Sequence, residues 1–458
     1  MCGILGIVSK SNDIPIKLYE GLTYLQHRGQ DSSGICNENE CIKKNGLVKD
    51  VFNESELQSL FSNIGMGQVR YGTNGSFKNT NIQPLINEKG KNRISLVHNG
   101  NIQNIKKLRE ILKMSDTIEL GDSELILELF SNELSKYDNY NYNDIFDIIS
   151  KMMRILEGSY CIIIIIKGYG LITFRDIYGI RPLVYGKKDN DYIISSESVV
   201  LDILEYQLIR DINPGEIILF EKNELPRFHQ YNKSSLHPCL FEYIYFARID
   251  SVLDEISIYN ARFEIGKLLG EKIKKQFDTK DIDMIVPVPD TSYIFALGLQ
   301  ETLQKKIQNG FVKNSYIDRT FIMKDNKIIN KNIKRKINAV KSILEGKNIL
   351  IVDDSIVRGN TSSHLIFLAK NAGAKKIYLA SGSPQVLYPN NYGIYIPDKE
   401  YLIAVNRTNK EIADVIGATR VIYNDLYEIV NCLKGLNPKI DGFEVSMFNG
   451  KKIEEINK

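Results

Sequence analysis

A cysteine at position 2 is the residue of this chain with the clearest capacity for nucleophilic chemistry. If the initiator methionine is removed, Cys2 carries a thiol, with an ordinary pKa of about 8.5, and a free α-amine, with an ordinary pKa of about 7.7–8.0. One residue then supplies a nucleophile and a base that is held beside it. A free cysteine is also commonly a small buried strand residue, so position alone leaves both interpretations open.

Four short motifs follow Cys2 in order, and each suits one task in the hydrolysis of the glutamine side-chain amide. They are QHRGQDSSG at 26–34, GQVRYGTNG at 67–75, HNGNI at 98–102 and GDSE at 121–124. Arg70 can pair with the α-carboxylate of a free amino acid, and Asp122 can pair with its α-ammonium group. We therefore predict that both residues bind glutamine.

The first and third motifs add backbone groups to this site. Gly29, next to Arg28, allows the backbone to approach a ligand closely, so we place both residues in the predicted glutamine site. Asn99 and the backbone N–H of Gly100 can form an oxyanion hole, in which one donor is worth roughly 2.7–4 kcal/mol. Each motif also has an ordinary explanation as a turn, a surface ion pair or a helix cap. Their joint occurrence behind Cys2 favours the catalytic interpretation.

A second group of polar residues follows an apolar strand in the segment NILIVDDSIVRGNTSS, residues 348–363. The backbone N–H groups of such a loop and the N-terminus of the next helix form a site for a phosphate dianion. Asp353 and Asp354 are unsuited to phosphate but suit ribose hydroxyls and a Mg²⁺ ion. The predicted phosphate contacts come from Ser355, Arg358, Gly359, Asn360 and Thr361. The segment therefore predicts a site for a phosphorylated sugar diol.

Two further segments fit the same ligand. VPVPDTS at 286–292 ends a predicted parallel strand at its carboxyl edge, where such sheets bind ligands. Either Thr291 or Ser292 can complete the metal site. Arg319 and a basic stretch that includes Lys336 can close over a pyrophosphate and exclude water. A solvated run of charge is the alternative interpretation of that stretch.

The elements that must position the first site follow from apolar patterns in the first half of the chain. Strands are expected at 2–8, 64–69, 94–97, 161–166, 171–174, 192–194 and 216–220, and helices at 18–26, 104–112 and 123–134. The unbroken isoleucines at 162–166 predict a strand that is buried on both faces, and Asp122 is a predicted N-cap. This arrangement indicates two sheets between two helix layers.

In the second half, strands alternate with helices, which predicts βαβ units and a parallel sheet. The helices are expected at 257–277, 293–307 and 361–372, and the strands at 283–288, 347–352 and 377–380. The polar segment 222–240 contains two prolines and is predicted to be a linker. The highly charged segment 324–341 is predicted to be a mobile loop.

Composition excludes several other classes of protein. The chain has 458 residues and a net charge of +3, too small to favour nucleic-acid binding. Its longest apolar run, residues 160–166, is far shorter than the ~20 residues of a membrane-spanning helix. The first residues lack the features of a signal peptide, and the six cysteines lack metal-binding spacing. We therefore expect a soluble cytoplasmic protein with reduced cysteines, without nucleic-acid or membrane partners.

The motifs quoted above resemble those of two known families. Residues 2–235 resemble the glutaminase domain of the N-terminal-nucleophile amidotransferases. Residues 236–458 resemble a type I phosphoribosyltransferase, whose signature for binding phosphoribosylpyrophosphate (PRPP) is similar to VDDSIVRGNTS at 352–362. The two in this order resemble the family of glutamine-dependent PRPP amidotransferases of purine biosynthesis. RDIYGIRPL at 175–183, FEYIYFARIDS at 241–251 and SIYNAR at 257–262 share the resemblance.

The resemblance implies a combined α+β and α/β fold. A four-layer αββα N-terminal-nucleophile hydrolase domain should precede a phosphoribosyltransferase domain with a parallel sheet. It implies that ammonia released from glutamine at Cys2 is channelled to PRPP, which yields 5-phosphoribosylamine, glutamate and pyrophosphate. It also implies Mg²⁺ held by Thr291, Asp353 and Asp354, feedback inhibition by purine nucleotides, and a homodimer or homotetramer.

The chain departs from the family pattern at two places. Asn360 stands where the family usually has threonine, and it still donates hydrogen bonds. Some members hold an iron–sulfur cluster with four cysteines. Cys239 matches one such ligand, but Asn390 stands where another would be, and Cys432 has no cysteine partner near the C-terminus. We therefore expect no iron–sulfur cluster.

Two other functions remain as alternatives. Another amidotransferase with the same glutaminase domain, such as glucosamine-6-phosphate synthase or asparagine synthetase, would lack the loop at 353–361. A non-catalytic sensor of PRPP or nucleotides would not need Cys2, Arg70, Asn99 and Asp122 together.

Overall fold

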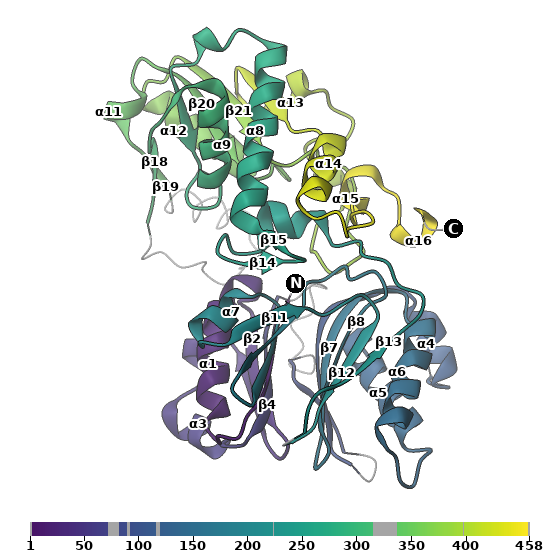
Figure 1. Ribbon diagram of the computed structural model, residues 1–458. Helices are drawn as coiled ribbons and strands as arrows, with labels where there is room; N and C mark the ends of the chain where they lie inside the picture. The colour runs from purple at the N-terminus through teal and green to yellow at the C-terminus, as the bar shows by residue number, and fades with distance from the viewer. Residues whose placement is uncertain are drawn as a thin grey trace.

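The computed structural model describes residues 2–71, 82–88, 92–115, 120–222, 224–314, 337–396 and 398–456. Two bodies follow each other along the chain, the first built on two antiparallel sheets and the second on a parallel sheet (Figure 1). Arg319 and Lys336, which were predicted to close over a pyrophosphate, lie outside the described residues.

The first sheet of the amino-terminal body carries Cys2 at the start of its central strand, and its strand order is β11-β9-β10-β1-β4-β2-β3. The strands are β1 (Cys2–Val8), β2 (Ser32–Asn37), β3 (Cys41–Asn45), β4 (Ile64–Arg70), β9 (Val184–Lys188), β10 (Asp191–Ser195) and β11 (Gln207–Asp211). Its outer face packs against α1 (Ile14–Tyr24), the 3-10 turn η1 (Gln26–Arg28), α2 (Val48–Val51), α3 (Glu54–Ser59) and α7 (Val199–Ile203).

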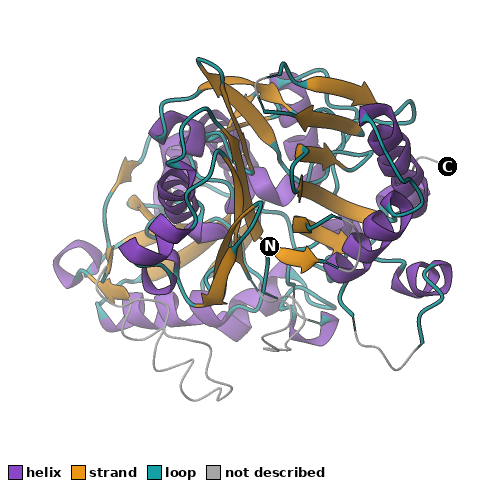
Figure 2. Ribbon diagram, turned by 90° about the horizontal axis from the view of Figure 1, so that it is seen from below, coloured by secondary structure: helices purple, strands orange, loops and turns teal. Residues whose placement is uncertain are grey.

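The second sheet has the order β13-β12-β8-β7-β6-β5. Its strands are β5 (Leu85–Asn87), β6 (Ile94–Ile102), β7 (Gly158–Ile166), β8 (Gly170–Arg175), β12 (Glu216–Phe220) and β13 (Arg227–Gln230). The helices α4 (Ile105–Ile111), α5 (Asp122–Leu134) and α6 (Tyr142–Ile155) cover its outer face. Figures 1 and 2 show both helix layers outside the two sheets, which confirms the predicted four-layer fold.

The isoleucine run at 162–166 shows why the layers hold together. Successive side chains of a strand point to opposite faces of the sheet. Ile162 and Ile164 therefore pack in the core beneath the helices, whereas Ile163 and Ile165 pack in the core between the two sheets. The prediction that this strand is buried on both faces is confirmed.

The carboxy-terminal body is built on a parallel sheet with the order β17-β16-β20-β21-β22. Its strands are β16 (Met284–Pro287), β17 (Lys306–Ile307), β20 (Asn348–Asp353), β21 (Lys376–Ser381) and β22 (Arg420–Tyr423). One face packs against α8 (Ile258–Gln276), α9 (Tyr293–Leu303) and α14 (Leu426–Leu436), and the other against α12 (Asn360–Asn371) and α13 (Asn409–Ile416). Because β16 pairs directly with β20, their carboxyl ends lie side by side.

Short elements complete the body. They are η3 (Glu242–Phe246), β14 (Val252–Leu253), β15 (Ile256–Ser257), η4 (Thr279–Asp281), β18 (Phe311–Lys313), β19 (Ile337–Ala339), α11 (Lys341–Leu344), η5 (Lys399–Tyr401), α15 (Ser446–Asn449) and α16 (Ile453–Ile456). The prediction of a mobile loop at 324–341 is wrong at its end, because β19 pairs with β18; the part up to residue 336 lies outside the described residues.

Three other local predictions are wrong. The segment 222–240 is not only a linker, because β13 within it pairs with β12 at the edge of the second sheet. The helix expected at 293–307 ends at Leu303, because Gln304 adopts a left-handed backbone conformation with φ of +54°. Gly121, rather than Asp122, is the N-cap of α5, and the Glu124 carboxylate accepts its N–H at 2.7 Å.

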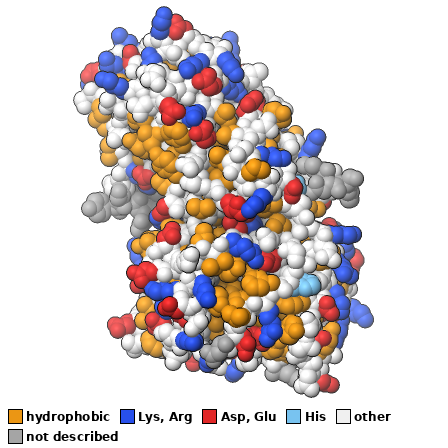
Figure 3. All heavy atoms as spheres, in the orientation of Figure 1, with side chains coloured by type: hydrophobic (Ala, Val, Ile, Leu, Met, Phe, Trp, Pro, Cys, Tyr) orange, Lys and Arg blue, Asp and Glu red, His pale blue; other side chains and the backbone are white. Residues whose placement is uncertain are grey.

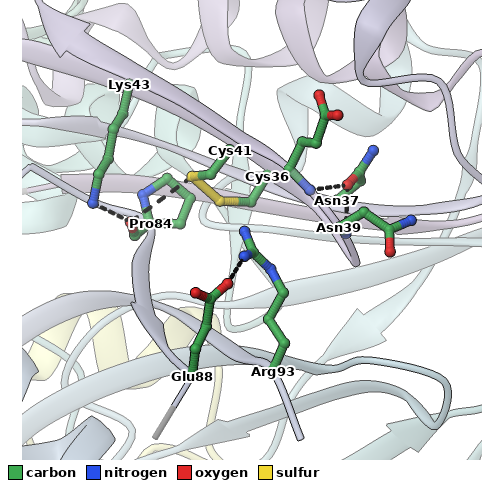
Figure 4. The surroundings of a disulfide bond; sticks show 9 residues. Cys36, Asn37, Asn39, Cys41, Lys43, Pro84, Glu88 and Arg93 are labelled. Atoms are coloured by element: carbon green, nitrogen blue, oxygen red, sulfur yellow. Dashed lines mark hydrogen bonds and ion pairs between the residues drawn. A yellow bond between two sulfur atoms is a disulfide. The ribbon is translucent and has the colours of Figure 1, made fainter.

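The sequence did not predict the disulfide between Cys36 and Cys41. These residues are opposite each other in the register of β2 and β3, and Figure 4 shows the bond between their sulfur atoms. Lys43, from the same hairpin, donates to the Pro84 carbonyl at 2.7 Å beside the bond (Figure 4). The expectation that all cysteines are reduced is therefore corrected at this pair.

Acidic and basic side chains are interspersed on the face drawn in Figure 3, so this face has no large patch of one charge. That mixture agrees with the net charge of +3. Among the described residues, no helix combines the length and the apolar character needed to cross a bilayer.

Candidate active sites

Cys2 lies beside residues from two of the predicted motifs. It is the first residue of β1, is 8% exposed, and is the register partner of Arg70 in β4. The Cys2 backbone nitrogen donates a hydrogen bond to Asn99 Oδ1 at 3.2 Å. The second sheet therefore reaches the amino-terminal residue of the first sheet through a side chain of β6.

Asn99 holds an unused donor beside this cysteine. Its side chain is fully buried, and its Nδ2 atom has no hydrogen-bond partner among the described residues. Leaving a buried donor unpaired costs about 1–3 kcal/mol, so this atom is suited to donate to a ligand. Gly100 follows with a φ of +158°, and a Cβ atom there would lie 2.0 Å from the Ser159 carbonyl oxygen. Only glycine fits this position.

Arg70 and Asp122 line the same small pocket. Its wall is formed by Arg70, Gln83, Leu85, Gly121, Asp122, Ser123 and Glu124. Asp122 Oδ1 accepts the Ser123 N–H at 2.8 Å, and its Oδ2 accepts the Ile102 N–H at 3.3 Å. The pocket therefore combines a cation and a fixed carboxylate, the two charges that a free amino acid requires.

His98 and Gln83 support this pocket, and no role for either was predicted. His98 Nδ1 lies 2.9 Å from Ser123 Oγ and 3.7 Å from Asp122 Oδ2. Burial lowers the pKa of His98, and the nearby Asp122 carboxylate opposes that effect only in part. Gln83 accepts the His98 N–H at 2.7 Å and donates to Ser123 Oγ at 2.9 Å. His98 stood within a quoted motif, whereas no sequence signal marked Gln83.

The Arg28 side chain is bonded to other groups, so a contact of this residue with glutamine would have to come from its backbone. Its guanidinium is fully buried, bonds to Glu197, and donates to Glu242 Oε2 at 2.8 Å. Burial alone would lower the pKa of Arg28, but these two carboxylates outweigh it and raise that pKa. At Gly29, a Cβ atom would lie 2.4 Å from the backbone nitrogen of Arg70. This glycine therefore allows η1 to approach β4.

The second predicted site lies at the adjacent carboxyl ends of β16 and β20. Asp353 is 7% exposed and Asp354 is 5% exposed. Thr291 donates its hydroxyl to Asp354, and Ser292 Oγ donates to Asp353 Oδ1 at 3.3 Å. Each hydroxyl therefore holds one carboxylate, and this geometry does not choose between them as a metal ligand.

The chemistry of this pair fits a divalent cation. Burial and the neighbouring carboxylate raise the pKa of Asp353 well above its ordinary value, and burial also raises the pKa of Asp354. A bound cation would compensate both charges. Within the described residues no cluster of three or more His, Cys, Asp or Glu side chains could hold a metal. A site with two carboxylates suits Mg²⁺, which keeps several waters and binds through substrate oxygens.

The predicted phosphate loop leads directly into α12. Gly359 is its N-cap with a φ of +78°, and it offers no side-chain cap to the first turn. The N–H groups at the start of a helix lack partners within the helix, so this terminus remains available to an anion. Arg358 lies over the Tyr401 ring, 6.0 Å from its centroid. The loop and both carboxylates thus occupy one edge of the sheet.

Asn390, which stands where a cluster ligand would be, forms a polar contact beside Cys239, which matches such a ligand. Asn390 Nδ2 donates to Glu444 Oε2 at 3.2 Å. Cys239 is fully buried and forms a β-bridge with Glu444. Burial raises the pKa of the Cys239 thiol. These donors, one thiol with an amide and a carboxylate, do not fit a cluster that needs four thiolates.

Comparison with known families agrees with this division of the chain. The family described as "Glutamine amidotransferase domain" matches residues 76–202, and the family described as "Phosphoribosyl transferase domain" matches residues 254–382. The fold and its two sites define a glutamine amidotransferase joined to a phosphoribosyltransferase.

Relatives of nearly equal length share this combination. Amidophosphoribosyltransferase of Escherichia coli (strain K12) is 43% identical over 98% of this chain and 92% of the relative. That of Saccharomyces cerevisiae is 41% identical over 99% and 92%. The structure of the Bacillus subtilis glutamine PRPP amidotransferase, complexed with ADP and GMP, has a TM-score of 0.87 at 30% identity and covers 99% of this chain and 97% of that chain. The chain belongs to the amidophosphoribosyltransferase family, the enzymes of the first step of purine biosynthesis.

Proposed function

We propose that Cys2, with its α-amine exposed by removal of Met1, is the nucleophile that releases ammonia from glutamine. The thiolate attacks the side-chain carbonyl carbon, the C–N bond breaks, and the α-ammonium group returns the proton to the leaving ammonia. Water then hydrolyses the thioester to glutamate. The observation that carries this proposal is the contact of the Cys2 nitrogen with Asn99, whose Nδ2 atom is buried and unpaired among the described residues.

Asn99 and Gly100 then stabilise the oxyanion of the tetrahedral intermediate. Preorganised donors are effective there because they need no reorganisation when charge develops. Arg70 binds the α-carboxylate of glutamine and Asp122 its α-ammonium, which is supported by their position in one pocket. Arg28 is not proposed as a side-chain ligand; with Gly29, it contributes through the backbone of its turn.

In the carboxy-terminal body, Asp353 and Asp354 face the ribose of PRPP. The loop of Ser355, Arg358, Gly359, Asn360 and Thr361 holds the 5′-phosphate. Both carboxylates, with Thr291 or Ser292, would hold Mg²⁺, which neutralises charge on the departing pyrophosphate when bound. Ammonia attacks C1 of the ribose as the bond to pyrophosphate breaks, and 5-phosphoribosylamine forms. Arg319 and Lys336 remain proposed contacts of the pyrophosphate.

Further parts of the proposal concern the whole protein. Ammonia passes between the sites through a channel, because protonation in water would remove its nucleophilicity.

Residues 2–235 and 236–458 are the two domains, supported by the end of the second sheet at Gln230. Purine nucleotides are proposed feedback inhibitors, supported by the ADP and GMP in the Bacillus subtilis complex. A homodimer or homotetramer in the cytoplasm, without an iron–sulfur cluster, completes the proposal.

Replacing the nucleophile tests the proposal. Cys2→Ala should abolish glutamine-dependent synthesis, because no thiol remains to attack the amide, and should leave ammonia-dependent synthesis near the wild-type rate. Both activities are measured as PRPP-dependent pyrophosphate release. Cys432→Ala, which removes a partly exposed thiol from α14, is the control and should retain both. Glutamine-dependent activity in the Cys2→Ala enzyme would contradict the assignment.

A further inference from the structure

A short segment of the carboxy-terminal body lies directly against the proposed oxyanion hole. The Asn101 side-chain amide donates to the Asn391 carbonyl at 2.8 Å. Ser159 Oγ donates to the Tyr392 carbonyl at 2.8 Å. Asn101 follows Gly100 in β6, and Ser159 lies beside it in β7. Both β6, which contains Gly100, and its neighbour β7 therefore bond to one segment of the carboxy-terminal body.

Gly393 makes the closest approach. Its φ is +94°, and a Cβ atom at this position would lie 3.0 Å from both the carbonyl carbon and the carbonyl oxygen of Gly100. An added methyl group therefore meets backbone rather than a flexible side chain. The other side of Gly100 is also blocked, because the Ser159 carbonyl oxygen lies where a Cβ atom of residue 100 would be. Gly100 is thus enclosed between Ser159 and Gly393.

Residues 390–394 are held by hydrogen bonds of their own, apart from their contacts with Asn101 and Ser159. Asn390 Oδ1 accepts the N–H groups of Tyr392, at 2.8 Å, and Ile394, at 3.2 Å. The fully buried Tyr392 donates its hydroxyl to Glu454 Oε2 at 2.5 Å. Arg181 Nε donates to the Tyr392 carbonyl at 2.8 Å. These hydrogen bonds therefore hold the segment in place.

We propose that residues 390–394 are positioning residues for glutamine hydrolysis, which hold the Gly100 N–H in the geometry that binds the oxyanion. This inference rests on the proposed oxyanion role of Asn99 and Gly100. A donor must be placed within about 0.5 Å of its productive position, and a misplacement of about 1 Å can cost 10²-fold in rate. The glutaminase site is therefore completed by a segment of the other body.

The test compares two glycines with similar backbone strain. Gly393→Ala should lower kcat for glutamine hydrolysis by about 10²-fold, with little change in KM for glutamine. Gly346→Ala is the matched control, because Gly346 has a φ of +72° and no atom within 4 Å of its Cβ position. It should leave kcat unchanged. Unchanged glutamine kcat in the Gly393→Ala enzyme would overturn the inference.

Two readouts separate positioning from loss of structure. Alkylation of Cys2 by iodoacetamide needs no oxyanion hole, so its rate, followed by mass spectrometry, should stay at the wild-type value in the Gly393→Ala enzyme. Ammonia-dependent synthesis should also be retained. If Gly393→Ala does not fold, the double variant Asn101→Ala with Ser159→Ala replaces it and should lower glutamine kcat by about 10-fold, two hydrogen bonds being lost. Wild-type kcat in that double variant would refute the inference.

A parallel variant separates failure of this inference from failure of the proposed function. Asn99→Ala should lower glutamine kcat because it removes a proposed oxyanion donor. If Asn99→Ala retains full kcat, the oxyanion assignment fails, and the positioning role fails with it. If Asn99→Ala loses activity while Gly393→Ala does not, only the positioning role is refuted.

Discussion

Asn99 links the two proposed tasks of the glutaminase site within one side chain. Its Oδ1 atom fixes the Cys2 nitrogen at 3.2 Å, and its Nδ2 atom is left unpaired among the described residues. An amide offers an acceptor and a donor a short distance apart. Neither aspartate nor leucine could supply both groups, so the residue type follows from the geometry. The adjacent pocket contains Arg70 and Asp122, the two residues that we propose bind the charged groups of a free amino acid.

Arg70 gives a prediction at this scale. Arg70→Ala should raise KM for glutamine and lower kcat/KM by roughly 10–100-fold, because a charge-assisted hydrogen bond is worth about 1.5–3 kcal/mol. Ammonia-dependent synthesis should be unaffected. Lys44→Ala removes an exposed cation of the same sheet, which pairs with Glu56 at 2.6 Å, and is the control. An unchanged KM for glutamine in the Arg70→Ala enzyme would exclude Arg70 as a ligand.

Sequence reasoning could single out these residues as candidates because each lies in a local motif. The supporting contacts could not be predicted, since they join distant parts of the chain. Gln83 reaches Ser123 from a segment without any motif. The ion pairs of Arg28 with Glu197 and Glu242 could not be predicted either, because both carboxylates lie far along the chain. A local motif identifies the chemistry of a residue but not which group that residue contacts.

At the scale of elements, apolar pattern predicted the strands that are buried on both faces and missed the exposed edges. β1 and β12 have the predicted bounds, because continuous apolar runs leave few alternatives. β13 was missed because it lies in a polar segment with prolines, and half of its residues are exposed. The end of α9 was missed because the left-handed residue that ends it is Gln304, and not the glycine that usually marks a helix end in the sequence.

Gly359 is the element-scale prediction, because it joins β20 to α12 through the phosphate loop. With a φ of +78°, a Cβ atom there would lie 2.3 Å from Ile403 Cδ1. Gly359→Ala should displace the loop and raise KM for PRPP by about 10-fold or more in the ammonia-dependent assay, whereas thiol alkylation at Cys2 is retained. Gly417→Ala, with a φ of +79° and a flexible lysine as its nearest neighbour, should leave that KM near the wild-type value. Equal effects of both variants would contradict the phosphate-loop assignment.

At the scale of the whole molecule, buried ion pairs join the two bodies. Glu242 of η3 accepts from Arg28 at 2.8 Å and from Arg181 at 3.1 Å, and Arg175 donates to Asp254 at 2.9 Å. All three arginines are fully buried. Removing one partner of a buried pair is costly because it leaves an uncompensated charge. The two bodies are therefore held in one arrangement.

Glu242→Gln should reduce the free energy of unfolding by about 3–5 kcal/mol, because two buried guanidinium groups lose their shared carboxylate. Glu255→Gln is the control. Its ion pair with Lys439 at 2.5 Å is exposed on both sides, so its loss should cost less than about 1 kcal/mol. Both are measured as shifts in the midpoint of denaturant unfolding. Similar shifts for the two variants would show that the buried network does not hold the bodies together.

In the proposed function, nitrogen released beside Cys2 reaches the sugar beside Asp353 and Asp354 without entering the solution. This transfer is tested by supplying glutamine labelled with ¹⁵N in its side-chain amide together with an excess of unlabelled ammonium, and measuring the isotope in trapped 5-phosphoribosylamine. Direct transfer should give product that carries the glutamine label almost entirely. Product diluted to the isotopic composition of the free ammonium pool would contradict it.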